Sequence, residues 1–198
     1  MLTFKHFNIA DWFSFYRIAT APILILFIIS DLRELFSWFL LISYSTDAID
    51  GFLARRLKIT SARGSQLDSF GDQITFIIGL CGLFIFEQPF IIEHLVIILL
   101  AFVPYIAQML LAYAKYGKST AFHTYLAKLS AVVQSVFILF SLFFEPNSIL
   151  FYSMIAFGLI ETFEEITLII MHDKWVSDVK GLYWVILKRH KEHNKNTT

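Results

Sequence analysis

The sequence predicts an all-α integral membrane protein with six transmembrane helices and a surface amphipathic helix near each end. Hydrophobic residues make up 57% of the 198 residues and charged residues only 16%. The mean hydropathy of +0.66 is higher than that of an ordinary soluble domain. The apolar residues are gathered into long segments, several of which approach the ~20 residues that a helix needs to cross a bilayer. A chain of this length predicts a single membrane-embedded domain over residues 1–198.

The six spans are separated by short polar connections. The second span has an apolar part, residues 35–44, that is too short to cross alone, so its helix is expected to continue through Ala54. The third is expected to begin near Gly64. The spans are predicted at residues 12–29, 35–54, 64–86, 91–114, 129–144 and 149–171.

Both ends of the chain have the pattern of helices that lie on a membrane surface. Residues 1–11 alternate apolar with polar side chains and form a juxtamembrane segment. The tail, residues 172–198, carries Trp175, Val179, Leu182 and Ile186 at helical spacing with lysines between them. This spacing predicts an amphipathic helix on the cytoplasmic surface.

Basic residues fall almost entirely on one side of the predicted topology. Of the 16 lysines and arginines, only Arg33 lies on the side opposite the two termini. Cytoplasmic loops are enriched in these residues, so both termini are predicted to face the cytoplasm. The net charge is zero, which gives no overall field for binding nucleic acid.

Four aspartates lie between the second and third spans. Asp47 and Asp50 are three residues apart, and Asp68 and Asp72 are four apart, so each pair lies on one face of its helix. Both pairs flank one basic loop and therefore lie at the same membrane face. Acids at this depth are functional by default, and converging carboxylates need cations between them. All-oxygen ligands favour hard divalent ions such as Mg²⁺, Mn²⁺ or Ca²⁺ over zinc, and we predict a pair of such ions, Mg²⁺ or Mn²⁺, at this site.

With its gaps, this stretch is D-x2-D-G-x2-A-R-x8-G-x3-D-x3-D, and it resembles the signature of the CDP-alcohol phosphotransferase family at every fixed position. The resemblance implies metal-dependent transfer of a phosphatidyl group from CDP-diacylglycerol to a small alcohol, with release of CMP. It also implies a homodimer. A short chain with six spans resembles the CDP-diacylglycerol enzymes more than the larger CDP-choline and CDP-ethanolamine enzymes.

The resemblance also assigns roles to the matching residues. It implies that Asp47, Asp50 and Asp68 bind the metal ions, and that Asp72 both approaches them and acts as general base on the acceptor hydroxyl. The implied nucleotide contacts are Asp50, Gly51, Ala54, Arg55 and Gly64. Among these, the small residues permit close approach of the nucleotide, and Arg55 pairs with the diphosphate.

The acceptor is less well defined. Near the N-terminus, the chain resembles the phosphatidylglycerophosphate synthase branch, which favours glycerol 3-phosphate, at residues Asn8, Ile9, Ser14, Arg17 and Pro22. Asp11, however, stands where that branch usually has asparagine. Inositol, inositol phosphate and serine stay open as acceptors.

Three basic residues are candidate contacts to the acceptor. Arg17 either binds an anionic headgroup or extends to the membrane surface as an anchoring residue. Lys118 and Lys128 either bind a phosphorylated acceptor or serve as positive anchors on the cytoplasmic side.

Other functions fit the sequence less well. A membrane prenyltransferase also holds a diphosphate through aspartates and Mg²⁺, but resembles a longer chain with two distant aspartate clusters. A transporter would place its acids near the midplane, often in repeated halves, and no repeat is visible here. A catalytically inactive relative would have lost a motif aspartate. Glu161, Glu164 and Glu165 are unusual in a last span and receive no catalytic role.

Overall fold

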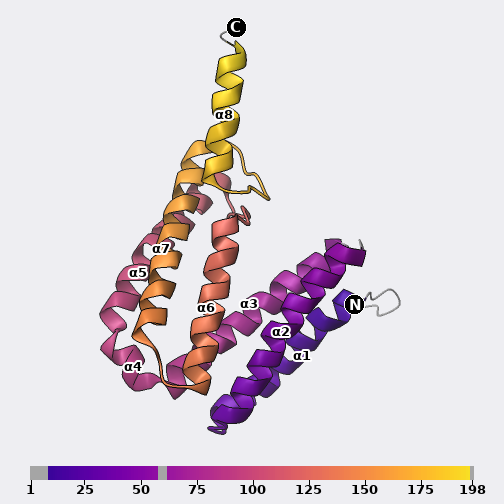
Figure 1. Cartoon of the computed structure of the whole chain (residues 1–198), viewed down its shortest axis with the longest axis vertical. Helices are drawn as coiled ribbons and strands as arrows, with labels where there is room; N and C mark the ends of the chain where they lie inside the picture. The colour runs from indigo at the N-terminus through magenta and orange to yellow at the C-terminus, as the bar shows by residue number, and fades with distance from the viewer. Residues whose placement is uncertain (1–8, 58–61, 197–198) are drawn as a thin grey trace. The chain divides into compact units, whose positions relative to one another are not determined.

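The computed structural model describes residues 9–57 and 62–196, and the all-α prediction is confirmed over these residues (Figure 1). The only strand-like pairing among them is an isolated bridge between Ala121 and Ser177. The helices are α1 (Ile9–Ile29), α2 (Arg33–Leu57), α3 (Ala62–Phe86), α4 (Gln88–Glu93), α5 (Leu95–Tyr116), α6 (Tyr125–Phe143), α7 (Ser148–Met171) and α8 (Leu182–Asn196).

The helix bounds agree with the predicted spans, with shifts of a few residues at the ends. The starts of α5 and α6 each differ from the predicted spans by four residues. Before α5, the predicted turn at residues 87–90 is mostly the short helix α4. The fourth span therefore begins later than predicted. Elsewhere, local signals set the ends: the side chain of Asn147 accepts hydrogen bonds from the backbone N–H groups of Ile149 and Leu150 and caps the start of α7.

Two helices in the described part of the chain, α5 and α6, are long and apolar enough to cross a membrane by length and composition. The outward side chains of α5 are apolar, with Val96, Leu100 and Leu110 each more than 60% exposed, as expected for a helix that faces lipid. The apolar stretches of α1 and α3 are shorter, and α7 carries three glutamates. The count of six spans therefore stays a prediction.

The chain divides into two compact units. The first unit comprises Met1–Ile91 and Ile138–Pro146, and the second comprises Ile92–Phe137 and Asn147–Thr198. In the first unit, α1 packs against both α2 and α3, and α2 also contacts α3. Successive helices run in opposite directions, so the start of α1, the end of α2 and the start of α3 lie at one end of this unit (Figure 1).

A tight turn joins α1 to α2. Asp31 has a φ of 55°, a left-handed conformation that aspartate tolerates better than most residues. The N–H of Leu32 donates to the carbonyl of Phe27, and the N–H of Asp31 donates to that of Ile28. These two bonds form a Schellman motif, which ends α1 and reverses the chain.

A close contact between α2 and α3 depends on a glycine. A Cβ atom on Gly82 would lie 2.3 Å from Cε1 and Cζ of the Phe36 ring, and Phe36 is fully buried. We expect Gly82→Ala to destabilise the protein by about 1–3 kcal/mol, because the ring must shift within a packed core. Thermal unfolding in detergent measures this effect.

The matched control is Gly158→Ala in α7. A Cβ there would meet only Nε2 of Gln134, at 3.8 Å. We expect this variant to be neutral or slightly stabilised, since alanine favours a helix over glycine. Equal melting temperatures for the two alanine variants would contradict the packing proposed for Phe36.

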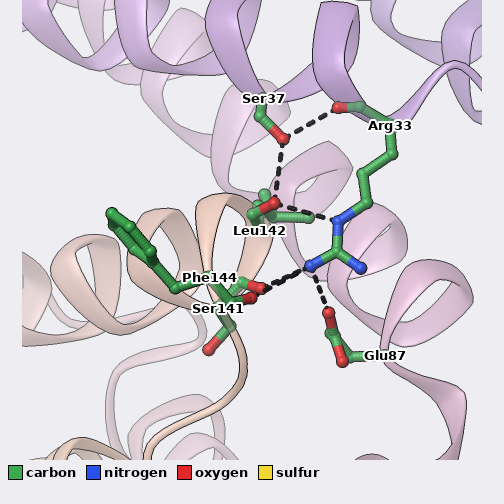
Figure 2. A network of polar contacts seen from close by, with 6 residues as sticks. All are labelled: Arg33, Ser37, Glu87, Ser141, Leu142 and Phe144. Atoms are coloured by element: carbon green, nitrogen blue, oxygen red, sulfur yellow. Dashed lines mark hydrogen bonds and ion pairs between the residues drawn. The ribbon is translucent and has the colours of Figure 1, made fainter.

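Arg33 ties α2 to the end of α6 within the first unit (Figure 2). Its guanidinium forms an ion pair with Glu87 and donates to the backbone carbonyls of Ser141, Leu142 and Phe144. The last carbonyls of a helix have no partners within the helix, and a cation there also meets the negative end of the helix dipole. Arg33, the one basic residue predicted to lie on the side opposite the termini, thus has a structural role.

The second unit is built on α5 and α7, which pack side by side (Figure 1). A buried apolar cluster joins them to the connecting segments and consists of Ala112, Phe122, Leu168, Ile169 and Val179. At the end of α7, the Tyr116 hydroxyl donates to the carbonyl of Ile169, and so does the Lys115 ammonium.

The prediction of one amphipathic helix over the tail is wrong for Trp175 and Val179. Within the described part of the tail only α8, from Leu182 onward, is helical, and residues 172–181 before it are irregular apart from the bridge between Ser177 and Ala121. The N–H of Val179 donates to the carbonyl of Phe122 at 2.7 Å, and the Val179 side chain is buried. Backbone pairing and burial therefore override the local helical spacing. The predicted N-terminal surface helix lies mostly outside the described residues.

Candidate active site

The helix bounds place the four aspartates of the motif at one end of the first unit. Asp47 and Asp50 lie in the last turns of α2, and Asp68 and Asp72 lie in the first turns of α3. The two helices run antiparallel and contact each other. The prediction that each aspartate pair lies on a helix, at the adjoining ends of two helices, is therefore confirmed at the level of the backbone.

Only one motif side chain, that of Asp72, belongs to the described part of the chain. The other side chains of the motif lie outside it: Asp47, Asp50, Gly51, Ala54, Arg55, Gly64 and Asp68. The donor set of four carboxylates fits a hard divalent cation, which prefers oxygen ligands. No group of three or more His, Cys, Asp or Glu side chains elsewhere in the described residues forms a competing metal site.

Buried hydroxyl groups lie one helical turn inside the aspartates. Ser43 precedes Asp47 by one turn on α2, and Thr75 follows Asp72 by one turn on α3. Ser43 is 0% exposed and Thr75 2%, and neither hydroxyl has a hydrogen-bond partner within the described residues. The interior of the unit just below the motif is therefore polar, unlike an ordinary helix core.

Helix α1 contributes a charged side chain that contacts this motif. Nη1 of Arg17 donates to Oδ1 of Asp72 in an ion pair. The Arg17 side chain is 1% exposed, whereas that of Asp72 is 45% exposed. A buried guanidinium requires a counter-charge, and Asp72 supplies it. The sequence drew attention to Arg17 because it stands in an apolar span, but did not predict this partner.

Arg17 is therefore not an anchoring residue at the membrane surface. An arginine in that role keeps its charged group in water, whereas this guanidinium is buried against α3. For Arg17 to contact the acceptor instead, its guanidinium would have to bind the acceptor while it is paired with Asp72.

The other two acceptor candidates belong to the second unit. The Lys118 ammonium lies 3.6 Å from the ring centroid of Trp175, and the indole N–H of Trp175 donates to the carbonyl of Ser119. Lys118 is thus held by a cation–π contact.

Lys128 lines a small surface pocket. The pocket has a volume of about 100 Å³ and is lined by His123, Tyr125, Lys128, Asp178, Val179 and Lys180. The two lysines outnumber the one carboxylate, and this balance suits an anion such as a phosphate.

Two glutamates of α7 prove to be structural. Thr120 and Gln108 both donate to Oε2 of Glu165. Thr124 donates to Oε2 of Glu164, and the N–H of Leu182 donates to Oε1 of Glu164 at 2.9 Å. Glu164 thereby binds the first N–H of α8, where a negative charge is favoured. These contacts join α7 to both connecting segments, a role that the sequence did not reveal.

Comparison with known families supports the motif. A family model described as CDP-alcohol phosphatidyltransferase matches residues 7–163, a range that contains the whole motif and Arg17. A search of individual curated proteins found no match. Because the family model covers well over half of the 198 residues, the chain belongs to the CDP-alcohol phosphatidyltransferase family of membrane-bound phosphotransferases of phospholipid biosynthesis.

Proposed function

We propose that this enzyme transfers the phosphatidyl group of CDP-diacylglycerol to the hydroxyl of a small alcohol and releases CMP, with glycerol 3-phosphate as the favoured acceptor. Family membership establishes the coarser activity, the transfer of a phosphatidyl group from a CDP-alcohol. The observation that carries the proposal is the placement of two aspartate pairs in the adjoining ends of α2 and α3, with the last aspartate paired to a buried arginine.

Enzymes of this family generally depend on divalent metal ions. Two such ions, Mg²⁺ or Mn²⁺, would be held by Asp47, Asp50, Asp68 and Asp72. When bound, the ions would supply charge neutralisation for the diphosphate of the donor. The small residues Gly51, Ala54 and Gly64 would let the nucleotide approach the helices closely, with Asp50 also in contact and Arg55 paired with the diphosphate.

Asp72 is proposed as the general base. One of its carboxylate oxygens accepts the proton of the acceptor hydroxyl while the hydroxyl oxygen forms a bond to the phosphorus that carries diacylglycerol. The bond from this phosphorus to CMP breaks, and CMP leaves with the electron pair. The half-exposed position of the Asp72 side chain is compatible with access of an alcohol.

Contacts to the acceptor are proposed for Lys128 and Lys118. The pocket of the second unit that includes Lys128 holds two lysines and one carboxylate, a composition that suits a phosphorylated alcohol such as glycerol 3-phosphate or inositol phosphate. Lys118 is already engaged with Trp175, so we give it the lesser role.

The location and assembly are also proposals. The excess of basic residues on the side of the termini supports an active site that faces the cytoplasm. The enzyme would then take its donor from the cytoplasmic membrane and its acceptor from the cytosol. We also propose that the enzyme is a homodimer, on the basis of the family resemblance alone.

The experiment that tests the function is CMP release by the purified protein in detergent. CDP-diacylglycerol is supplied with Mg²⁺ or Mn²⁺, and glycerol 3-phosphate, inositol, inositol phosphate and serine are compared as acceptors. We expect metal-dependent release of CMP with a phosphorylated acceptor. Release only with inositol or serine would overturn the acceptor assignment. Folded protein that neither binds CDP-diacylglycerol nor releases CMP would overturn the proposed reaction, in favour of transport or a structural role.

A further inference from the structure

The contact between Arg17 and Asp72 joins two helices at the proposed catalytic carboxylate. We propose that Arg17 is a positioning residue, which holds the carboxylate of Asp72 in the orientation needed to accept the proton of the acceptor hydroxyl. This inference rests on the proposed function and adds a residue of α1 to a site otherwise built from α2 and α3.

The two side chains differ in the way that such a role requires. Asp72 is 45% exposed, and an exposed aspartate side chain rotates readily between rotamers. Arg17 is 1% exposed, and α1 packs closely against α3. The buried guanidinium, held in place by the packing around it, can therefore orient the more exposed carboxylate of Asp72.

Guanidinium geometry explains how one contact restrains the whole carboxylate. The donors of an arginine lie in one rigid plane and bind carboxylate oxygens in fixed directions. Because both oxygens of a carboxylate share a plane, holding Oδ1 also sets the direction of Oδ2. Misplacement of a reacting group by about 1 Å can lower a rate by about 100-fold, so this restraint matters for proton transfer.

The same geometry argues against Arg17 as the contact to the acceptor's phosphate. Its charge is already neutralised by Asp72, and its side chain is almost fully buried. A phosphate would have to share the guanidinium with this carboxylate and reach a side chain that is almost fully buried. The two roles also differ in their kinetics, since a positioning residue affects kcat, whereas an acceptor contact affects the KM for the acceptor.

The test measures CMP release by full-length Arg17→Met and Arg17→Lys variants at varied concentrations of donor and acceptor. For Arg17→Met we expect a fall in kcat of about 100-fold, with both KM values within about twofold of wild type. Arg17→Lys keeps the charge without the planar fork, so it should recover part of the lost kcat. It also keeps the experiment informative if Arg17→Met folds poorly.

Arg33→Met is the matched control. Arg33 belongs to the same unit and forms an ion pair with Glu87, but its contacts stabilise the end of α6. We expect this variant to melt at a lower temperature while the folded fraction keeps the wild-type kcat.

A double-mutant cycle with Asp72→Asn separates positioning from a general structural role. If Arg17 acts through Asp72, then Arg17→Met causes no further fall in kcat once Asp72 is replaced. Thermal unfolding of the same four proteins should also give a coupling between the two sites, a readout that needs no activity.

Three results would overturn the inference. A raised KM for the acceptor with wild-type kcat would make Arg17 an acceptor contact. Wild-type kinetics with only a lower melting temperature would leave Arg17 as a structural residue. Independent effects of the two substitutions would show that Arg17 does not act through Asp72. In each of these cases, activity of the wild-type enzyme still supports the proposed function. A wild-type enzyme that is inactive towards every acceptor would overturn both the proposed function and the positioning role of Arg17.

Discussion

The Asp72→Asn variant is expected to lose roughly 10²–10⁴-fold in kcat for CMP release, the range that a general base contributes. Asparagine has nearly the same size and shape as aspartate, and its amide oxygen can still accept a hydrogen bond from Arg17. It cannot, however, accept a proton as a carboxylate does, and it is a weaker ligand for a hard cation. The KM for CDP-diacylglycerol should change far less than kcat, because the donor contacts proposed for the other three aspartates and Arg55 are kept.

The control for this variant is Asp31→Asn. Asp31 lies in the turn between α1 and α2, at the opposite end of the first unit, and has a left-handed φ of 55°. Asparagine tolerates this conformation as well as aspartate does, so stability and kcat should both stay close to wild type. An Asp72→Asn enzyme with more than about a tenth of the wild-type kcat would exclude Asp72 as the general base.

Removal of divalent metal ions is expected to lower activity by about 10³-fold or more. The loss of several kcal/mol of charge stabilisation on the diphosphate corresponds to a change of that size. The measurement is CMP release after treatment with a chelator, followed by titration with Mg²⁺ or Mn²⁺. Full recovery is expected with either ion, because both accept all-oxygen coordination.

A second measurement tests whether the predicted aspartate ligands bind the metal ion on which activity depends. Mn²⁺ should raise the melting temperature of the wild-type protein, because a ligand that binds only the folded state stabilises it. This shift should shrink in Asp47→Asn and persist in the control Asp173→Asn, which lies in the segment after α7. Full activity in the chelated enzyme would be incompatible with the proposed metal site.

Asp72, Arg17 and the proposed metal ligands, whose loss is expected to lower activity, all lie at one end of the first unit. The glutamates of α7, by contrast, are engaged with Thr120, Thr124, Gln108 and the start of α8. Acids within a membrane-embedded helix usually indicate function, but here hydrogen bonds to both connecting segments explain Glu164 and Glu165. The sequence alone could not distinguish a functional acid from a structural one, because the role of each acid depends on which residues lie near it in space.

The sequence by itself determined the fold class, the approximate helix bounds and the position of the motif. Each of these depends on residues close together in the chain: apolar periodicity marks the helices, and the spacing of Asp47, Asp50, Asp68 and Asp72 places each pair on one helix face. Family membership follows from the same local pattern and is confirmed over residues 7–163.

Only the tertiary structure decided which distant residues meet. The pairing of Arg17 with Asp72 and the binding of Arg33 to the end of α6 depend on how the helices pack, which local spacing does not specify. The tail shows the same limit: Val179 lies at helical spacing from Leu182 and Ile186, yet it lies outside the helix, and its backbone N–H donates to the carbonyl of Phe122. Burial against a neighbouring segment outweighs a local preference worth a few tenths of a kcal/mol per residue, so such contacts appear only once the fold is known.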